Sequence, residues 1–110
     1  SITDDSFISE LKDGKIKNYQ VSPKDFGLSY GNFESIKALS PQESFEKVSL
    51  AFAGREGSVQ DMIAINSAAA LKLSGIVKSL KEGVELSKSA MNEGLAQSKL
   101  ESYVKMSNNL

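Results

Sequence analysis

The stretch from Ser58 to Gly75 constrains the fold most, because it is the most apolar run in the chain and carries a signal at each end. Ser58 is expected to cap the first turn of a helix, since a serine side chain can accept a backbone N–H there. Asp61 follows where the positive end of the helix dipole favours an anion. Gly75 can adopt the left-handed conformation that ends a helix. The sequence therefore predicts a helix over residues 58–74.

The apolar side chains of this stretch recur at helical spacing and cover a wide arc, so the helix should be buried on most sides. Several of them are small enough for neighbouring elements to approach closely, and a leucine at Ala69 is expected to overpack the core. The apolar set is Val59, Met62, Ile63, Ile65, Ala68, Ala69, Ala70, Leu71 and Leu73.

Residues 6–21 predict a β-hairpin, because Asp13-Gly14 is a strong two-residue turn signal. Pro23 ends the second strand, and residues 22–28 are expected to form a turn or a single helical turn. Residues 29–39 are interpreted as a loop pinned by apolar residues, or as a short extended segment. With Lys12 opposite Lys15, the other facing pairs are Leu11–Ile16, Glu10–Lys17 and Ile8–Tyr19, of which Glu10–Lys17 should be a favourable charge pair.

Three further helices are predicted, at about residues 41–53, 80–93 and 95–106. Ser40 and Ser79 are N-caps, each followed three residues later by a glutamate. Gly83 lies inside the second of these helices, where glycine costs about 1 kcal/mol relative to alanine, so a packing reason is expected. Gly94 breaks or kinks the chain. The expected inward residues are Phe45, Val48, Ala51 and Phe52 of the first helix, Leu80, Val84, Ser87 and Met91 of the second, and Leu100, Tyr103 and Val104 of the third.

Composition excludes several classes of function. The 13 basic and 14 acidic side chains give a net charge of −1, which offers no field for nucleic acid or anionic lipid. The chain has no histidine and no cysteine, so the commonest general base and any thiolate metal site are absent. No apolar run is long enough to span a membrane and no signal peptide is visible, so a cytoplasmic location is expected. The start at Ser1 suggests a piece of a longer polypeptide.

Few residues are candidates for a functional site. Gly54-Arg55-Glu56-Gly57 could clamp RNA as in a KH module or hold a phosphate at a helix N-terminus, but a plain helix link is the simpler interpretation. Thr3-Asp4-Asp5 could bind a divalent cation, or could be a solvated loop. Asn66 could meet a ligand, but more often such a residue bonds the backbone of a neighbouring loop. Lys72, Lys78 and Lys81 are most simply a solvated face. The residues alone predict no catalytic, cofactor-binding or metal-binding position.

Five segments, in this order and at this spacing, resemble the C-terminal region of anthranilate phosphoribosyltransferases. The resemblance spans nearly the whole chain, although Glu43-Ser44-Phe45 and Asp4-Asp5 depart from the family's usual residues. The segments are Glu10-Leu11-Lys12-Asp13-Gly14-Lys15-Ile16, Pro23-Lys24-Asp25-Phe26-Gly27-Leu28, Asp61 to Leu71, Ser79 to Leu86, and Glu93-Gly94 followed by Leu100-Glu101.

The resemblance implies a role in an enzyme that transfers phosphoribose from phosphoribosyl pyrophosphate to anthranilate in tryptophan biosynthesis. It implies a two-domain enzyme, a homodimer, whose magnesium-binding Asp-Glu pair would lie just before Ser1. None of the family's catalytic motifs lies in this chain, so no catalytic residue is carried over. This segment itself would be structural, and inactive alone.

Two strands followed by four helices form an α+β order, which also fits the end of an α/β domain whose main sheet lies elsewhere. We therefore expect residues 1–110 to be the C-terminal portion of the large α/β domain of such an enzyme. The alternatives are a related phosphoribosyltransferase or nucleoside-phosphorylase-type enzyme with another acceptor, a KH-like RNA-binding module, and a small helical interaction module.

Overall fold

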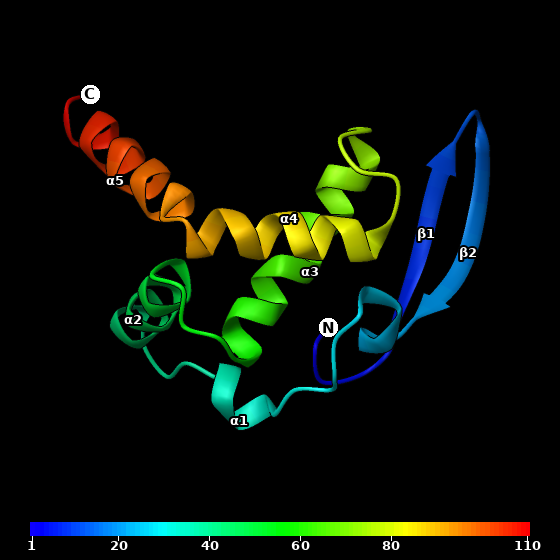
Figure 1. The fold of residues 1–110 in the computed structure, drawn as a ribbon, viewed down its shortest axis with the longest axis horizontal. Helices are drawn as coiled ribbons and strands as arrows, with labels where there is room; N and C mark the ends of the chain where they lie inside the picture. The colour runs from blue at the N-terminus through cyan, green and yellow to red at the C-terminus, as the bar shows by residue number, and fades with distance from the viewer.

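The computed structural model describes all 110 residues. Figure 1 shows the hairpin at one end, α3 and α4 in the centre, and α2 and α5 at the other end. The two-stranded sheet followed by helices confirms the expected fold class. The elements are β1 (Ser6–Lys12), β2 (Lys15–Val21), the 3-10 helix η1 (Pro23–Phe26), α1 (Phe33–Ile36), α2 (Pro41–Phe52), α3 (Ser58–Leu73), α4 (Leu80–Asn92) and α5 (Leu95–Asn108).

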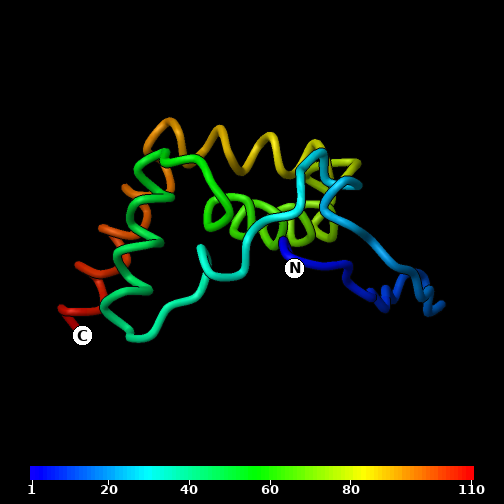
Figure 2. The backbone as a smooth tube through the Cα atoms, turned by 90° about the horizontal axis from the view of Figure 1, so that it is seen from below, coloured from blue at the N-terminus to red at the C-terminus, as the bar shows by residue number.

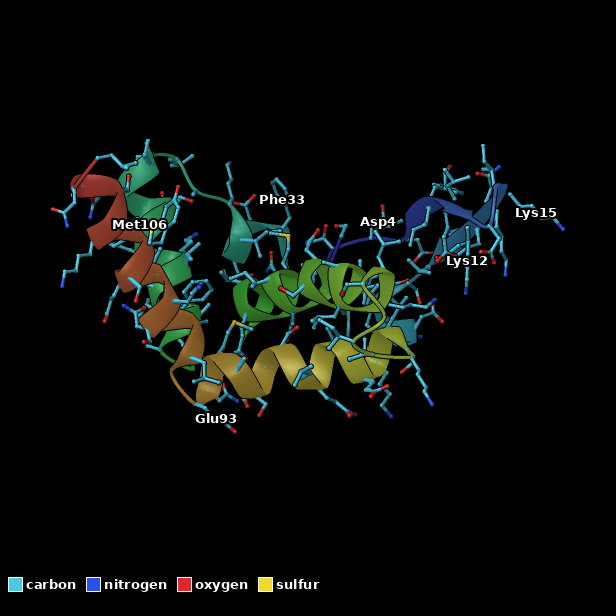
Figure 3. All side chains as sticks on the ribbon, turned by 90° about the horizontal axis from the view of Figure 1, so that it is seen from above. Asp4, Lys12, Lys15, Phe33, Glu93 and Met106 are labelled. Carbon is cyan, nitrogen blue, oxygen red and sulfur yellow. The ribbon has the colours of Figure 1, made fainter.

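The hairpin has the predicted register, from Lys12 opposite Lys15 to Ile8 opposite Tyr19. Asp13 and Gly14 have φ values of 51° and 74°, as a primed two-residue turn requires. Ile8 and Tyr19 face the core, whereas Phe7 on the other face is 84% exposed. Lys12 and Lys15 mark the hairpin tip, which projects away from the helices (Figure 3).

The expected Glu10–Lys17 ion pair does not form, although the two residues are opposite each other. The Tyr19 hydroxyl donates instead to Glu10 Oε2 over 3.4 Å, and Lys17 Nζ lies 5.7 Å from the centre of the Tyr19 ring. Burial, and then the charge of Glu10, raises the pKa of Tyr19. Glu10 and Lys17 therefore each interact with Tyr19 instead of with each other.

The closest approach between helices occurs where α4 crosses α3 at Gly83. A Cβ at Gly83 would lie 2.7 Å from the Cα and 2.8 Å from the Cβ of Ala68, closer than side chains pack. This contact is the packing reason expected for Gly83. The neighbouring α4 residues Val84, Ser87 and Met91 are buried as predicted, and the Ser87 hydroxyl donates to Gly83 O over 2.7 Å.

The prediction that α3 is buried on most sides is wrong. Its buried residues, Gln60, Ala64, Ile65 and Ala68, form one face. Ala69 is exposed and Leu73 is 77% exposed, because only α4 packs along the helix at close range. The expected overpacking by a larger residue at Ala69 is therefore wrong as well, since the close contact belongs to Ala68.

Other inward faces are also less buried than expected. Phe45 is 57% exposed, so only Ala51 of α2 is fully buried. No residue of α5 is buried, and Tyr103 is largely exposed. Helix α5 extends outward from Gly94 at the end of the molecule opposite the hairpin (Figure 2), so little of the chain is there to cover it.

The stretch expected to be a loop or an extended segment contains the one-turn helix α1. The Asn32 side chain caps it by accepting from Glu34 N over 2.9 Å. Segment 22–28 forms the predicted single turn, with Phe26 buried and Gly27 in the left-handed conformation. The Asn32 cap explains why a helical turn forms here. The spacing of the apolar residues alone did not distinguish a helix from a loop in this stretch.

The chain exposes far more surface than a compact monomer of its size. Its accessible surface is 7679 Å², whereas a compact monomer of 11.9 kDa exposes about 6,000 Å². Its radius of gyration is 15.1 Å, compared with about 13 Å for a compact chain of this length. Both edges of the hairpin are unpaired, as expected from the sequence. None of the helices has the length and apolar character needed to cross a membrane.

Replacing Gly83 with alanine tests the α3–α4 contact, because propensity and packing predict opposite signs. In an exposed helix, the change should stabilise the protein by about 1 kcal/mol. Here we expect a destabilisation of about 1–3 kcal/mol, because the new methyl group overlaps the backbone of Ala68. Denaturant unfolding measures the difference, with the exposed Ser89→Ala as the control on the same helix. A Gly83→Ala protein more stable than the wild type would contradict this packing.

Replacing Gly14 with valine tests the turn. No heavy atom lies within 4 Å of a Cβ at this position, so the cost comes only from the positive φ, at about 1–2 kcal/mol. We expect amide hydrogen exchange in residues 8–19 to accelerate by roughly 5- to 30-fold. Gly14→Asn is the control, because asparagine tolerates this conformation. Equal protection in the valine and asparagine proteins would exclude a primed turn.

Candidate functional site

The Gly54-Arg55-Glu56-Gly57 loop is built as a helix connection. Gly54 has a φ of 92°, its N–H bonds to Ala51 O, and Arg55 N bonds to Leu50 O over 3.0 Å. These two bonds close the last turn of α2 in the Schellman pattern. Of the three interpretations, the plain helix link therefore describes the loop.

Helix α3 begins without the predicted cap. Gly57, with a φ of 144°, is the N-cap, and Ser58 is the first residue of the helix. The Ser58 hydroxyl lies instead against residues 31–32, where it accepts from Asn32 N over 3.4 Å. A side chain at Gly31 would meet this hydroxyl at 2.8 Å. Ser58 therefore holds an incoming loop rather than its own helix.

A cavity of about 440 Å³ opens beside the start of α3 and is the best candidate for a phosphate site. Its charged lining residues are Glu43, Glu46, Lys47, Arg55 and Glu56, so acids outnumber bases. Lys47 Nζ is already held by Glu43 at 3.3 Å and by the carbonyl oxygens of Ser35 and Lys37. An anion would find one free cation here, Arg55, among three carboxylates. The cavity does not suit a phosphate or an RNA backbone.

Gln60 is a buried polar residue that the sequence analysis did not single out. Its Nε2 donates to Ala51 O over 3.3 Å and to Asn92 Oδ1 over 3.0 Å, so it joins α2, α3 and α4. The neighbouring Asp61 Oδ1 lies 2.5 Å from Lys88 Nζ and joins α3 to α4 by charge. The sequence does contain a sign of this role, because two adjacent polar residues in the first turn of an apolar helix need polar partners. Both residues hold helices together.

The acidic cluster at the N-terminus is occupied by hydrogen bonds. Gln20 Nε2 donates to Asp5 Oδ2 over 2.8 Å, and the Tyr30 hydroxyl donates to Asp5 Oδ1. The latter bond raises the pKa of Tyr30. Asp5 N donates to Asp4 Oδ1 over 2.8 Å. The cluster ties the start of the chain to β2 and to the segment after η1. No group of three or more acidic side chains comes close enough together to hold a metal ion.

The remaining candidates have structural contacts or none. Asn66 is exposed and donates to Met62 O of its own helix over 2.9 Å, so the expected bond to a neighbouring loop is wrong. Lys78 and Lys81 are exposed and Lys72 is half-buried. The stem of Lys81 covers Gly27, where a Cβ would meet Lys81 Cε at 3.4 Å. The structure therefore assembles no acid–base pair or nucleophile from these side chains.

A sequence model of the glycosyl transferase family, a/b domain, matches residues 1–97. The chain therefore belongs to the glycosyl transferase family and lies within its α/β domain. The resemblance found in the order of the motifs is confirmed at this level, and the KH-like and free-standing helical alternatives have no support.

Several proteins similar to this chain carry the name of one kind of enzyme. The chain is 38% identical over 107 residues to an anthranilate phosphoribosyltransferase of Vesicomyosocius okutanii, covering 97% of the chain and 32% of the relative. It is 38% identical over 105 residues to one of Neisseria meningitidis, covering 94% and 30%. It also resembles the crystal structure of the Thermus thermophilus enzyme, with a TM-score of 0.74 and 30% identity over 80% of the chain and 27% of that structure. The chain thus spans about a third of the length of these relatives.

The start of α2 should be sensitive to acid. The backbone N–H of Leu39, and then Lys47, hold the pKa of Glu43 below its usual value of 4.5. The folded state thus favours the carboxylate, and this stabilisation is present above the usual pKa and is lost as the pH falls through the lowered one. We expect Glu43→Gln to flatten the fall in unfolding free energy between about pH 6 and about pH 3.

The control for this prediction is Glu56→Gln, which removes the same charge from a side chain that makes no hydrogen bond or ion pair. Parallel unfolding curves against pH for the Glu43→Gln protein and the wild type would contradict the assignment.

Proposed function

We propose that this chain is the C-terminal portion of the α/β domain of an anthranilate phosphoribosyltransferase, which transfers phosphoribose from phosphoribosyl pyrophosphate to anthranilate. The observation that carries the proposal is the 38% identity over 97% of the chain to a protein of that name. A related enzyme with another acceptor is less well supported, because the similar proteins and the similar crystal structure all carry the anthranilate name.

The chain's contribution is structural. None of its positions matches a catalytic motif of the family that it resembles, and its exposed surface exceeds that of a compact monomer. The hairpin edges would extend the sheet of the parent domain, since two strands alone are marginally stable in water. The helices would then cover one face of that domain and the rim of its cleft. The substrates would be held by the part of the enzyme outside this chain.

Magnesium does not fit the residues of this chain. Both oxygens of Asp5 accept hydrogen bonds from the protein, Asp4 Oδ1 accepts one from Asp5 N, and no third acidic side chain joins the two. Magnesium is usually bound by one or two carboxylates together with substrate phosphates. The ligands would therefore lie outside this chain, as the resemblance implies, and no step of the reaction involves a side chain of residues 1–110. We further propose a cytoplasmic, homodimeric enzyme, on the same resemblance.

A chimaera tests the function. In it, residues 1–110 replace the matching segment of the Vesicomyosocius okutanii relative. We expect the chimaera to consume anthranilate with phosphoribosyl pyrophosphate and magnesium, and the 110-residue chain to show no turnover, because positioning and charge stabilisation supply most of the rate in such displacements. Loss of anthranilate fluorescence measures the reaction, with the unaltered relative as control. Turnover by the chain alone would contradict its structural role, and a folded but inactive chimaera would contradict the family function.

A further inference from the structure

An apolar groove runs between α3 and α4. It has a volume of about 400 Å³, and eight of its ten lining residues are hydrophobic. None carries a charge, and Leu86 on its wall is 45% exposed. The lining is Phe52, Ile63, Ser67, Ala70, Leu71, Leu86, Ser87, Ala90, Met91 and Ala96.

The residues that line the groove indicate what kind of element can pack into it. Helices α3 and α4 contribute eight of the ten lining residues, and Phe52 of α2 and Ala96 of α5 complete the lining. Small side chains occur on both of the main helices, at Ser67 and Ala70 of α3 and at Ala90 of α4. Small residues let the axis of a third helix approach to the short end of the usual range of about 8–10 Å. A helix laid into such a groove presents an apolar stripe, with its polar residues on the outer face.

The amount of exposed surface indicates how large the partner is. The chain exposes about 1,700 Å² more than a compact monomer of its mass. A standard interface between two proteins covers about 800 Å² on each partner, which is about half of this excess. The relatives extend well beyond the match, which covers about a third of their length. They contain enough additional chain to cover the whole excess.

We propose that the apolar groove is filled by an amphipathic helix from the part of the enzyme outside residues 1–110. The inference rests on the proposed function for the identity of that part, and on the groove for its chemistry. The helix contributes uncharged apolar side chains that pack between Ala70 and Leu86. The groove is therefore the place where this segment is fastened to the body of its own enzyme.

Thiol accessibility tests the proposal, because the chain has no cysteine of its own. Ala70→Cys places a thiol in the groove, and Ser89→Cys places a control thiol on the exposed side of α4. Each is made in the 110-residue chain and in the chimaera, with cysteines of the relative's part changed to serine. We expect the reaction of Cys at position 70 with a maleimide to be at least tenfold slower in the chimaera, and that at position 89 to be unchanged. Equal rates for position 70 in both proteins would overturn the proposal.

Photo-crosslinking from the same thiol identifies the occupant. We expect the crosslinked residues of the chimaera to lie in the relative's part and to recur three or four positions apart, as on one face of a helix. Crosslinks at every second residue would indicate a strand, and crosslinks between two copies of residues 1–110 would indicate self-association. Either result would overturn the proposal.

A charge in the groove separates this inference from the proposed function. We expect Leu86→Glu to abolish protection of the thiol at position 70, whereas Leu86→Met keeps it, since methionine conserves volume and apolar character. If the thiol at position 70 is protected in a chimaera that does not convert anthranilate, the proposal for the groove holds and the proposed function is contradicted. An active chimaera in which the thiol at position 70 is not protected would contradict only the proposal that a helix fills the groove.

Discussion

The close contact between Ala68 and Gly83 determines how the rest of the molecule is assembled. Because neither residue has a side chain larger than a methyl group at the crossing, α4 lies directly on the backbone of α3. This brings Val84 and Met91 onto the same apolar cluster as Ala64 and Ile65. The hairpin and η1 attach to one side of that cluster, and α2 is tied to the other end through Gln60. Enlarging either residue of the contact would separate the two helices that supply most of the buried apolar cluster.

Local signals predicted most of the elements. The Asp13-Gly14 turn, the Ser40 and Ser79 caps and the helix-ending glycines act within a few residues, so the sequence contains all the information they need. Gly83 could also be interpreted, because a glycine inside a helix carries a cost that packing must offset. These predictions depend on backbone chemistry and not on what covers a given face.

The failures concern burial. The apolar residues of α3, Phe45 and α5 have the spacing of an inward face, but much of their surface is exposed because few elements of this chain lie against them. Ser58 is a plausible cap because a serine side chain can accept a backbone N–H, but its hydroxyl accepts from Asn32 N of the neighbouring loop instead. Pattern analysis identifies which face of a helix is apolar, and cannot specify which neighbour is present to bury it. That is why family membership could be inferred from motif order, while the candidate sites could only be tested by their contacts.

The contact between Ala68 and Gly83 makes α3 and α4 the most stable part of this chain, whereas the hairpin and α5 bury little apolar surface. Native-state hydrogen exchange of the 110-residue protein tests this most directly, since it reports local opening residue by residue. We expect the slowest exchange in the facing turns of α3 and α4 around Ala68 and Gly83, and faster exchange in the two strands of the hairpin and in α5. Uniform protection across the hairpin, the central helices and α5, all lost in one cooperative transition, would contradict it.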